Sequence, residues 1–263
     1  MDLGIAGKVA AVAASSQGLG FACARELARE GASVAMCSRY RERIDRAATK
    51  IHEETGAEVY ATVVDVSQQE DCIRFIEETV RQFGRLDILV TNTGGPAPGA
   101  LDDINYDHVR EGFDSTLMSA IVMMKATAPV MRKNKWGRII NILSMTVKQP
   151  KVNLLVSNTM RPAILGFAKS ISFELAGEGV TVNNVAPGYT RTERLIELAE
   201  HLAKQSGETV EDVFAGWERT VPARRLGLPE ELAAVVAFLA SERAGYMTGV
   251  TIQVDGGSVL GLF

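Results

Sequence analysis

Short apolar runs alternate with helical patterns along almost the whole chain, and this alternation restricts the fold more than any other feature. Strands this apolar, each separated by a helix, are typical of a parallel sheet that is buried on both faces. A right-handed crossover at each connection then yields a doubly wound, three-layer α/β fold. The runs expected to form strands are residues 8–14, 33–38, 58–66, 86–92, 137–144, 180–187 and 248–257.

The intervals between these runs carry helical signals. Ile73, Ile76, Val80 and Phe83 recur at spacings of three and four, which indicates the buried stripe of a helix. The other expected helices are residues 21–31, 41–54, 106–133 and 164–175. Because no repeat, low-complexity tract or linker interrupts the pattern, we predict a single domain over residues 1–263.

One segment departs from the alternation. Residues 192–222 are rich in Glu, Ala and Leu and lie between the strand at 180–187 and the final helix. In a doubly wound fold, such an insert lies beyond the carboxyl ends of the strands, where ligands bind. We therefore predict a helical lid over the substrate, with a plain surface excursion as the alternative.

Composition excludes several classes of protein. The 263 residues are 46% hydrophobic, which allows a large core, and the formal net charge of −4 argues against nucleic acid as a partner. No apolar run reaches the roughly 18 residues that a membrane span needs, and no basic segment precedes the first strand. The three cysteines lack C-x-x-C spacing and the three histidines lack partner spacing. We expect a cytoplasmic protein without a metal site.

A glycine-rich turn follows the first expected strand. The stretch "AVAASSQGLGFACA" places Ala14, Gly18 and Gly20 directly between that strand and the first helix. Glycine there lets backbone N–H groups approach a phosphate, and the helix N-terminus adds partial positive charge. Turns need glycine in any case, but this position favours dinucleotide binding.

Five motifs extend the pattern over essentially the whole chain, in the order "GKVAAVAASSQGLG", "DILVTNTGG", "GRIINILS", "VNNVAPG" and "QVDGG". Together they resemble the short-chain dehydrogenase/reductase family, particularly its 3-oxoacyl-[acyl-carrier-protein] reductase branch. The resemblance implies a Rossmann-type domain, a nicotinamide cofactor and a homo-oligomer, either a tetramer or a dimer. The family turn T-G-x-x-x-G-x-G is matched imperfectly, because Ala13 and Ala14 replace its threonine and first glycine.

The resemblance also implies positions that contact the cofactor. Asp65 matches the aspartate beside the adenine, and Asn92 matches the strand end beside the adenosine ribose. Pro187, Gly188 and Thr192 match the segment that meets the nicotinamide carboxamide. The full set carried over is Ala14, Ser16, Gly18, Leu19, Gly20, Ser38, Arg39, Asp65, Val66, Asn92, Gly94, Arg161, Pro187, Gly188 and Thr192.

The end of the second expected strand bears on the choice of cofactor. An acidic residue there would accept hydrogen bonds from a free 2′-hydroxyl, but this chain has Ser38 followed by Arg39. A guanidinium beside a hydroxyl suits a 2′-phosphate, which favours NADP(H) over NAD(H). Arg41 and Arg43 follow closely, so a solvated arginine cluster is the alternative.

The catalytic positions depart furthest from the family. Its serine is matched by Ser144, whereas its tyrosine, lysine and asparagine positions hold Ser157, Arg161 and Thr116. A serine hydroxyl is a far weaker acid than a phenol. Arg161 can still bind ribose hydroxyls, although it cannot relay protons as lysine does.

Several explanations of these substitutions remain open. Ser157 and Pro162 are also typical of the start of a helix, where hydroxyls cap the first turn and a proline is tolerated within it. Ser144 and Ser157, together with the Asn158 amide, suit an oxyanion site for reduction of a conjugated C=C bond. A different acid or base would have to come from Tyr189, Lys148 or Lys151, near the pocket mouth.

The sequence thus favours an NADP(H)-linked oxidoreductase acting on a small or acyl-thioester carbonyl compound, resembling oxoacyl reductases. Ser144 would polarise the substrate oxygen, Ser157 would donate a secondary hydrogen bond and Arg161 would hold the nicotinamide ribose. The alternatives are a non-catalytic cofactor-binding subunit or sensor and an enoyl or dienoyl reductase with a serine oxyanion site. A lyase or isomerase would need an acid or base that the sequence does not identify.

Overall fold

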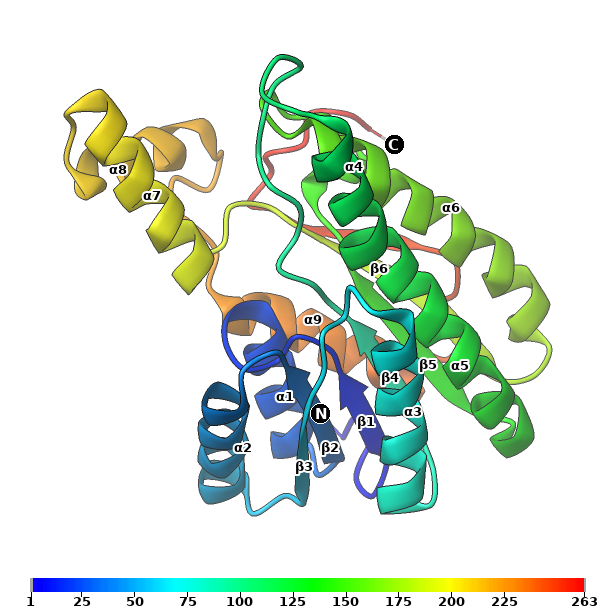
Figure 1. Cartoon of the computed structure of the whole chain (residues 1–263). Coiled ribbons are helices and arrows are strands. Elements are labelled where there is room, and N and C mark those ends of the chain that lie inside the picture. Colours follow the sequence, from blue (N-terminus) through cyan, green and yellow to red (C-terminus); the bar gives the residue numbers. More distant parts are fainter. Residues whose placement is uncertain (1, 263) are drawn as a thin grey trace.

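A seven-stranded parallel sheet forms the centre of the computed structural model, which describes residues 2–262 apart from the side chains of His201 and Gln205. Its strand order is β3-β2-β1-β4-β5-β6-β7, and every described pairing is parallel (Figure 1). This confirms the predicted doubly wound α/β fold. The strands are β1 (Val9–Val12), β2 (Ser33–Ser38), β3 (Val59–Val63), β4 (Ile88–Thr91), β5 (Gly137–Ile142), β6 (Val180–Pro187) and β7 (Thr251–Val254).

Helices cover both faces of the sheet. α1, α2 and α9 pack on one face, and α3, α5 and α6 pack on the other. Their bounds are α1 (Gly18–Arg29), α2 (Arg41–Thr55), α3 (Gln69–Phe83), α5 (Ser119–Asn134), α6 (Leu155–Ala176) and α9 (Pro229–Ala240). None of the helices in the described part of the chain is both long and apolar enough to cross a membrane.

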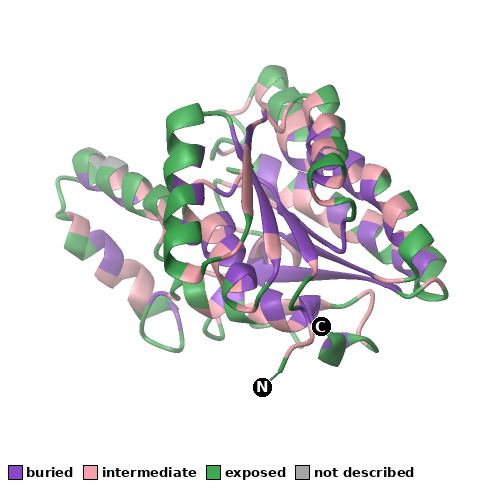
Figure 2. Cartoon of the chain, turned by 90° about the horizontal axis from the view of Figure 1, so that it is seen from below, coloured by how far each residue is buried: buried purple, intermediate pink, exposed green. Residues whose placement is uncertain are grey.

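The sheet separates two hydrophobic cores. In β1, Ala10 and Val12 pack with the helices of one face, whereas Val9 and Ala11 pack with those of the other. All four residues of this strand are buried, as a strand covered on both sides requires. The buried residues therefore concentrate in the strands and on the inner sides of the helices (Figure 2).

The strand order reverses direction next to β1, which pairs with β2 on one side and β4 on the other. Such a switch point opens a crevice beyond the carboxyl ends of the strands. The segments that follow β1, β2 and β4 all begin at this edge, so the fold brings the glycine-rich turn, Ser38 and Asn92 together.

The helix predicted over residues 106–133 contains a change of geometry. It runs as α4 (Tyr106–Gly112), a π-helical turn η1 (Phe113–Met118) and α5. π-turns of this kind interrupt the regular hydrogen-bond pattern and occur frequently at functional sites. Thr116 lies within the π-turn and is fully buried.

The start of α6 differs from the capping interpretation of the sequence. The helix begins at Leu155, and Pro162 lies inside it. Ser157 is therefore a buried residue of the first turn and caps nothing. Apolar Leu155 and Val156 precede the polar residues, and the packing of α6 onto the sheet sets the boundary in place of a capping side chain.

The segment 192–222 forms a helical hairpin that projects from the body beside the carboxyl ends of the strands (Figure 1). It contains α7 (Glu193–Ser206) and α8 (Val210–Thr220). The hairpin has a small core of its own, in which Tyr189 stacks on Trp217 with ring centroids 5.6 Å apart. Its buried members are Ala199, Ala203, Val213, Phe214 and Leu226.

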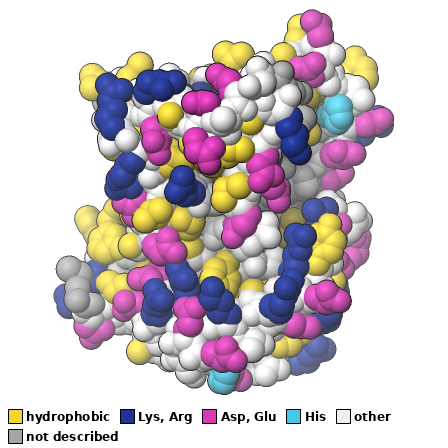
Figure 3. Space-filling view, turned by 90° about the vertical axis from the view of Figure 1, so that its left-hand side faces the viewer, with side chains coloured by type: hydrophobic (Ala, Val, Ile, Leu, Met, Phe, Trp, Pro, Cys, Tyr) yellow, Lys and Arg dark blue, Asp and Glu magenta, His cyan; other side chains and the backbone are white. Residues whose placement is uncertain are grey.

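Surface charge is mixed on the side of the molecule where the hairpin and α2 lie. Lys and Arg side chains are interspersed there with Asp and Glu side chains (Figure 3). No large basic field is visible on this face, whereas a nucleic-acid footprint would be basic throughout.

Candidate functional site

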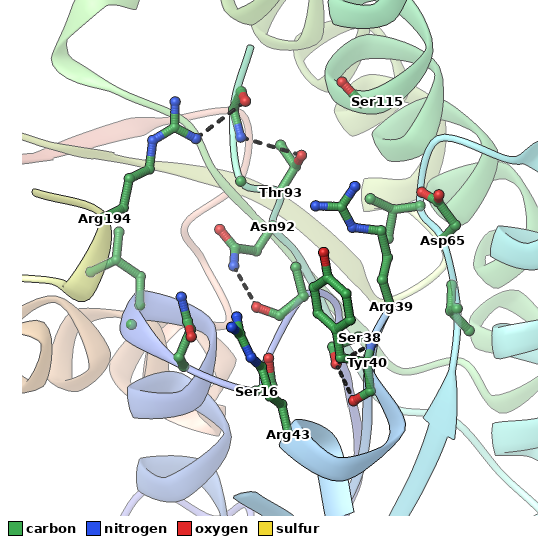
Figure 4. A pocket seen from close by; sticks show the side chains of 18 of the residues that line it. Ser16, Ser38, Arg39, Tyr40, Arg43, Asp65, Asn92, Thr93, Ser115 and Arg194 are labelled. Carbon is green, nitrogen blue, oxygen red and sulfur yellow. Dashed lines mark hydrogen bonds between the residues drawn. The ribbon is translucent and has the colours of Figure 1, made fainter. Parts of the chain in front are cut away.

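A cleft of about 370 Å³ lies at the switch point, between the ends of β1, β2, β3 and β4 and the start of α7. Its size falls within the usual range of ligand sites. The lining residues are Ala14, Ser16, Gln17, Gly18, Leu19, Ser38, Arg39, Tyr40, Arg43, Val64, Asp65, Val66, Ser67, Asn92, Thr93, Gly94, Gly95, Ser115, Thr192, Glu193 and Arg194 (Figure 4).

The glycine-rich turn forms the floor of the cleft. Asn92 at the end of β4 donates from Nδ2 to the carbonyl oxygen of Ala14, at 3.1 Å, and so ties two strand ends together. A Cβ on Gly20 would overlap that carbonyl oxygen and lie 2.8 Å from the Asn92 amide nitrogen. Only glycine fits at position 20, which itself packs beneath the turn and does not line the cleft.

Ala14 has a backbone φ of +47°, in the left-handed region that favours glycine. The family has glycine at this position, so the alanine retains the turn at a cost in backbone strain of about 1 kcal/mol. The imperfect match to the family turn thus appears in the structure as a strained backbone φ at Ala14.

The end of β2 presents two guanidinium groups to the cleft. Arg39 and Arg43 flank the ring of Tyr40, with guanidinium carbons 5.7 and 5.0 Å from its centroid. Neither forms an ion pair with any described carboxylate, whereas Arg41 pairs with Asp45 on α2, at 3.4 Å. The arginine cluster therefore divides into one surface ion pair and two unpaired cations at the cleft.

Ser38 and Asp65 complete this end of the cleft. The Ser38 hydroxyl lies 3.3 Å from both the backbone N–H and the carbonyl oxygen of Tyr40. The Asp65 carboxylate accepts from the backbone N–H and the hydroxyl of Ser67, at 3.0 and 2.9 Å, and thereby holds the turn after β3. These local bonds orient both side chains, and Asp65 lies on the same side of the cleft as Arg39 (Figure 4).

The start of α7 closes the opposite side. Thr192 caps this helix by accepting from the backbone N–H of Leu195, at 3.3 Å. Arg194 reaches back across the cleft to donate to the carbonyl oxygens of Gly95 and Pro96, at 3.2 and 3.1 Å (Figure 4).

Pro187, Gly188 and Arg161 were carried over as cofactor contacts but lie outside the lining of this cleft. Pro187 ends β6, and a Cβ on Gly188 would come within 2.7 Å of the Asp255 backbone. Gly188 is thus required by close packing against the segment after β7, whatever contacts it makes with a ligand.

The four residues that the resemblance matched to the family's catalytic positions come from the turn after β5, from α6 and from the π-turn. Ser144 follows β5, and its Oγ accepts from the backbone N–H of Thr146, at 3.2 Å. Ser157 makes no side-chain hydrogen bond to any described residue, and the buried Thr116 Oγ1 likewise has no partner among them. Two of the hydroxyls at these positions are thus free of protein partners.

Arg161 is held by the backbone. Its Nη1 donates to the carbonyl oxygens of Leu143 and Ile142 at the end of β5, whereas its buried Nε has no partner among the described residues. Burial, aided by the nearby positive charge of Arg194, lowers the pKa of the Arg161 guanidinium to about 10. The group remains charged at neutral pH and is oriented by carbonyls in place of a carboxylate.

Asn158 does not belong to an oxyanion site, contrary to the sequence-based expectation. Its side-chain amide donates to the carbonyl oxygen of Lys151 at 2.8 Å and accepts from the N–H of the same residue at 3.3 Å. The amide is consumed in fixing the loop before α6. Lys151 places its ammonium 5.6 Å from the ring centroid of Tyr189, whose pKa is raised by burial.

Sequence reasoning missed three cleft residues that carry charge, Arg43, Glu193 and Arg194. Arg43 lies four positions after Arg39, at the start of α2, so the spacing of the two arginines was a usable signal. Arg194 gave no such signal, because its placement depends on how the hairpin packs against the loop after β4. Among the side chains that the structure describes, no cluster of three or more His, Cys, Asp or Glu is suited to a metal ion.

Comparison with known proteins identifies the family. Residues 13–259 match the profile of the family described as enoyl-(acyl carrier protein) reductase. The chain is 34% identical to the NADPH-dependent reductase BacG of Bacillus subtilis, over 96% of this chain and 98% of that protein. It is 37% identical to dehydrogenase/reductase SDR family member 4 of Bos taurus, over 96% of this chain and 87% of that protein.

A solved structure extends the similarity to three dimensions. L-sorbose reductase from Gluconobacter frateurii, complexed with NADPH and L-sorbose, matches with a TM-score of 0.96 and 32% identity, and the match covers 100% of both chains. Three observations point to the same family: the strand order, the turn after β1 and the similarity over nearly the full length of the chain. The chain therefore belongs to the short-chain dehydrogenase/reductase family.

Proposed function

We propose that this protein is an NADPH-dependent reductase that acts on a carbonyl or acyl-thioester substrate. The observation that carries the proposal is the pair of unpaired cations at the end of β2. Arg39 and Arg43 border the cleft beside the Ser38 hydroxyl and have no carboxylate partner among the described residues. These donors suit the 2′-phosphate that NADPH has and NADH lacks. Two similar proteins support this assignment: BacG is an NADPH-dependent reductase, and L-sorbose reductase was solved in complex with NADPH.

The residues of the cleft fit the remainder of a dinucleotide. Gly18 has a φ of +59°, lies at the N-terminus of α1 and lines the cleft, and the free N–H groups of a helix N-terminus suit a phosphate. Thr192 offers a hydroxyl from the opposite side, and Asp65 lies at the adenine end. NADPH, when bound, supplies the hydride.

A titration with both nicotinamides tests the cofactor assignment. Purified protein is titrated with NADPH and with NADH, followed by cofactor and protein fluorescence, and adenosine 2′-monophosphate is added as a competitor. We expect NADPH to bind at least about tenfold more tightly, from one or more charge-assisted hydrogen bonds to the phosphate, and the competitor to displace it. Equal affinities, or binding of neither nicotinamide, would contradict the proposal.

At the reacting end, the hydroxyls of Ser144 and Ser157 would hydrogen-bond to the substrate oxygen and stabilise negative charge there. Neither hydroxyl is a strong acid, so a ketone reduction would lose a proton-transfer contribution of roughly 10² to 10⁴ in rate. Arg161 would stabilise charge electrostatically, and we assign it no proton transfer.

Reduction of a conjugated C=C bond is the second candidate. What favours it is the lack of an acid at the tyrosine position, because such a reduction needs only donors that stabilise an enolate oxygen. The matching family profile, described as an enoyl-(acyl carrier protein) reductase, supports the same class.

Product analysis separates these two reactions. Cyclohex-2-enone and crotonyl and acetoacetyl thioesters are incubated with NADPH, and the products are identified. Cyclohexanone would indicate C=C reduction, and the allylic alcohol would indicate carbonyl reduction. Retention of NADPH without turnover of the panel would favour the non-catalytic subunit or sensor. In Ser157→Tyr/Arg161→Lys, we expect carbonyl reduction to increase relative to the parent.

The proposal extends to the hairpin and to assembly. We assign α7 and α8 the role of a substrate lid, because Thr192, Glu193 and Arg194 border the cleft from this side. The resemblance to the family further suggests a cytoplasmic homotetramer or homodimer. Analytical ultracentrifugation tests the assembly, and protection of the hairpin from protease by NADPH tests the lid.

A further inference from the structure

Two arginines from different helices converge on one glycine beside the reacting end of the cleft. Gly95 follows β4 and has a φ of +73°. A Cβ at this position would lie 3.0 Å from Nη2 of Arg161, on α6, and 3.2 Å from Nη1 of Arg194, on α7. Only a residue without a side chain leaves space for both guanidinium groups, which therefore share one side of the loop.

Neither cation has an anionic partner. In the described part of the chain, Arg161 and Arg194 form no ion pair and donate only to backbone carbonyls. Glu197 favours the charged form of Arg194 without making contact, and no carboxylate influence on Arg161 is resolved. Two neighbouring cations repel each other, and a bound anion would relieve this repulsion.

The donors that remain are suited to an oxyanion. Nε of Arg161 is buried and has no partner among the described residues, and its Nη2 faces the space above Gly95. A guanidinium presents such N–H groups in a planar fork that matches the two oxygens of a carboxylate. The depressed pKa of Arg161, about 10, agrees with a buried cation that lacks its counter-charge.

The position of the pair indicates which molecule brings the anion. Arg161 lies one turn after Ser157 on α6, so the two side chains share a face of the helix. The carbonyl that accepts from Arg161 belongs to Leu143, which directly precedes Ser144. The cofactor phosphates are expected elsewhere, at the turn of Gly18 and at Arg39.

We propose that Arg161 and Arg194 form a recognition site for a carboxylate of the substrate, next to the serines that would bind its reacting oxygen. This inference rests on the proposed reductase function and adds the substrate class, an oxo or enone acid in place of a neutral ketone. Arg194 belongs to the hairpin, so binding of the carboxylate would also draw α7 towards the loop after β4.

Matched acids and esters test the site. Pyruvate, acetoacetate and levulinate, each compared with its methyl ester, are titrated into the NADPH-loaded protein, and cofactor fluorescence is followed. We expect at least one acid to bind about tenfold or more tightly than its ester, as charge-assisted hydrogen bonds predict. In Arg194→Gln, this preference should disappear when the acids and esters are titrated at saturating NADPH.

Arg191→Gln is the control. Arg191 lies just before Arg194, is exposed and packs over the ring of Phe214, 5.1 Å from its centroid. Its replacement removes a positive charge from the same segment without touching the pair, so the preference for acids should persist.

Three results would overturn the inference. They are equal binding of every acid and its ester, an acid preference that survives in Arg194→Gln, and a parallel loss of NADPH affinity in that variant. The last would assign the pair to the cofactor. The acid titrations are repeated on cofactor-free protein and followed by protein fluorescence. A preference for acids over esters in this experiment does not require NADPH. Failure of the carboxylate site can therefore be distinguished from failure of the reductase proposal.

Discussion

The expected adenosine end of the site and its expected reacting end differ in how their polar groups are used. At the adenosine end, Arg39 and Arg43 face the cleft without an ion pair in the described structure. At the reacting end, the positions matched to the family's catalytic residues do not line the cleft. There, Arg161 is bound to backbone carbonyls, and the hydroxyl of Thr116 is buried without a partner among the described residues. The first end presents cations that suit a phosphate, and the second presents hydroxyls and one cation held by the backbone.

Under the proposed function, this contrast separates binding from chemistry. Cofactor binding would use backbone turns and cations at the edge of the sheet. The reaction would depend on side chains of α6 and of the turn after β5, where a single exchange alters the available proton chemistry. The following substitutions test the contrast, and they run from the largest expected effect to the smallest.

The strongest test replaces the two serines of the reacting end. Ser144→Ala is expected to lower kcat by about 10² to 10³, because it removes a donor to the developing oxyanion, and Ser157→Ala should lower it further. Substrate-dependent oxidation of NADPH measures the effect. NADPH affinity should not change, and Ser170→Ala, an exposed serine on the same helix, provides the control. Full activity in both Ser144→Ala and Ser157→Ala would show that these hydroxyls do not stabilise an oxyanion.

The next test addresses the adenosine end. Arg39→Gln and Arg43→Gln should each weaken NADPH binding by about tenfold to a hundredfold, the value of one charge-assisted contact, with little effect on NADH. The ratio of the two dissociation constants, from fluorescence titration, reports the 2′-phosphate contact. Arg41→Gln is the matched control, since Arg41 pairs with Asp45. An equal decrease in the affinity for NADPH and for NADH would mean that the arginines bind another part of the cofactor.

A third test probes the turn that serves both ends. Gly20→Ala should lower the free energy of unfolding by about 1–3 kcal/mol, because its Cβ would overlap the Ala14 carbonyl oxygen. In Gly18→Ala, the added Cβ would lie no closer than 3.5 Å to any neighbouring atom. The free energy of unfolding should therefore fall only by the strain of the positive φ, about 1 kcal/mol. Urea unfolding compares the two variants. The reverse order of stabilities would show that the turn relaxes around a side chain at position 20.

The smallest effect is expected at Ala14. Ala14→Gly should raise the free energy of unfolding by about 0.5–1 kcal/mol, because glycine adopts a positive φ without strain. Its neighbour Ala13, which has no positive φ, should lose stability when changed to glycine. Urea unfolding again measures both variants. A loss of stability in both would indicate that the Ala14 methyl group makes packing contacts that outweigh the strain.

Sequence reasoning located the strands and most helices because their hydrophobic periodicity records local burial. The helix expected over residues 164–175 begins nine residues earlier, at Leu155, and tertiary packing there overrides the capping preference of Ser157. The π-turn around Thr116 also went unpredicted, because a change in helix geometry leaves no distinct periodicity over six residues.

The sequence by itself determined the doubly wound fold, the phosphate turn at Gly18 and Gly20, and the basic strand end at Arg39. Each is a local signal, carried by periodicity, by backbone freedom or by a residue type at a strand end. The tertiary structure alone decided that Arg161 is bound by the carbonyls of β5 and that Arg194 meets it over Gly95. These contacts join segments far apart in the chain, and their geometry follows from how the helices pack on the sheet and where the hairpin lies.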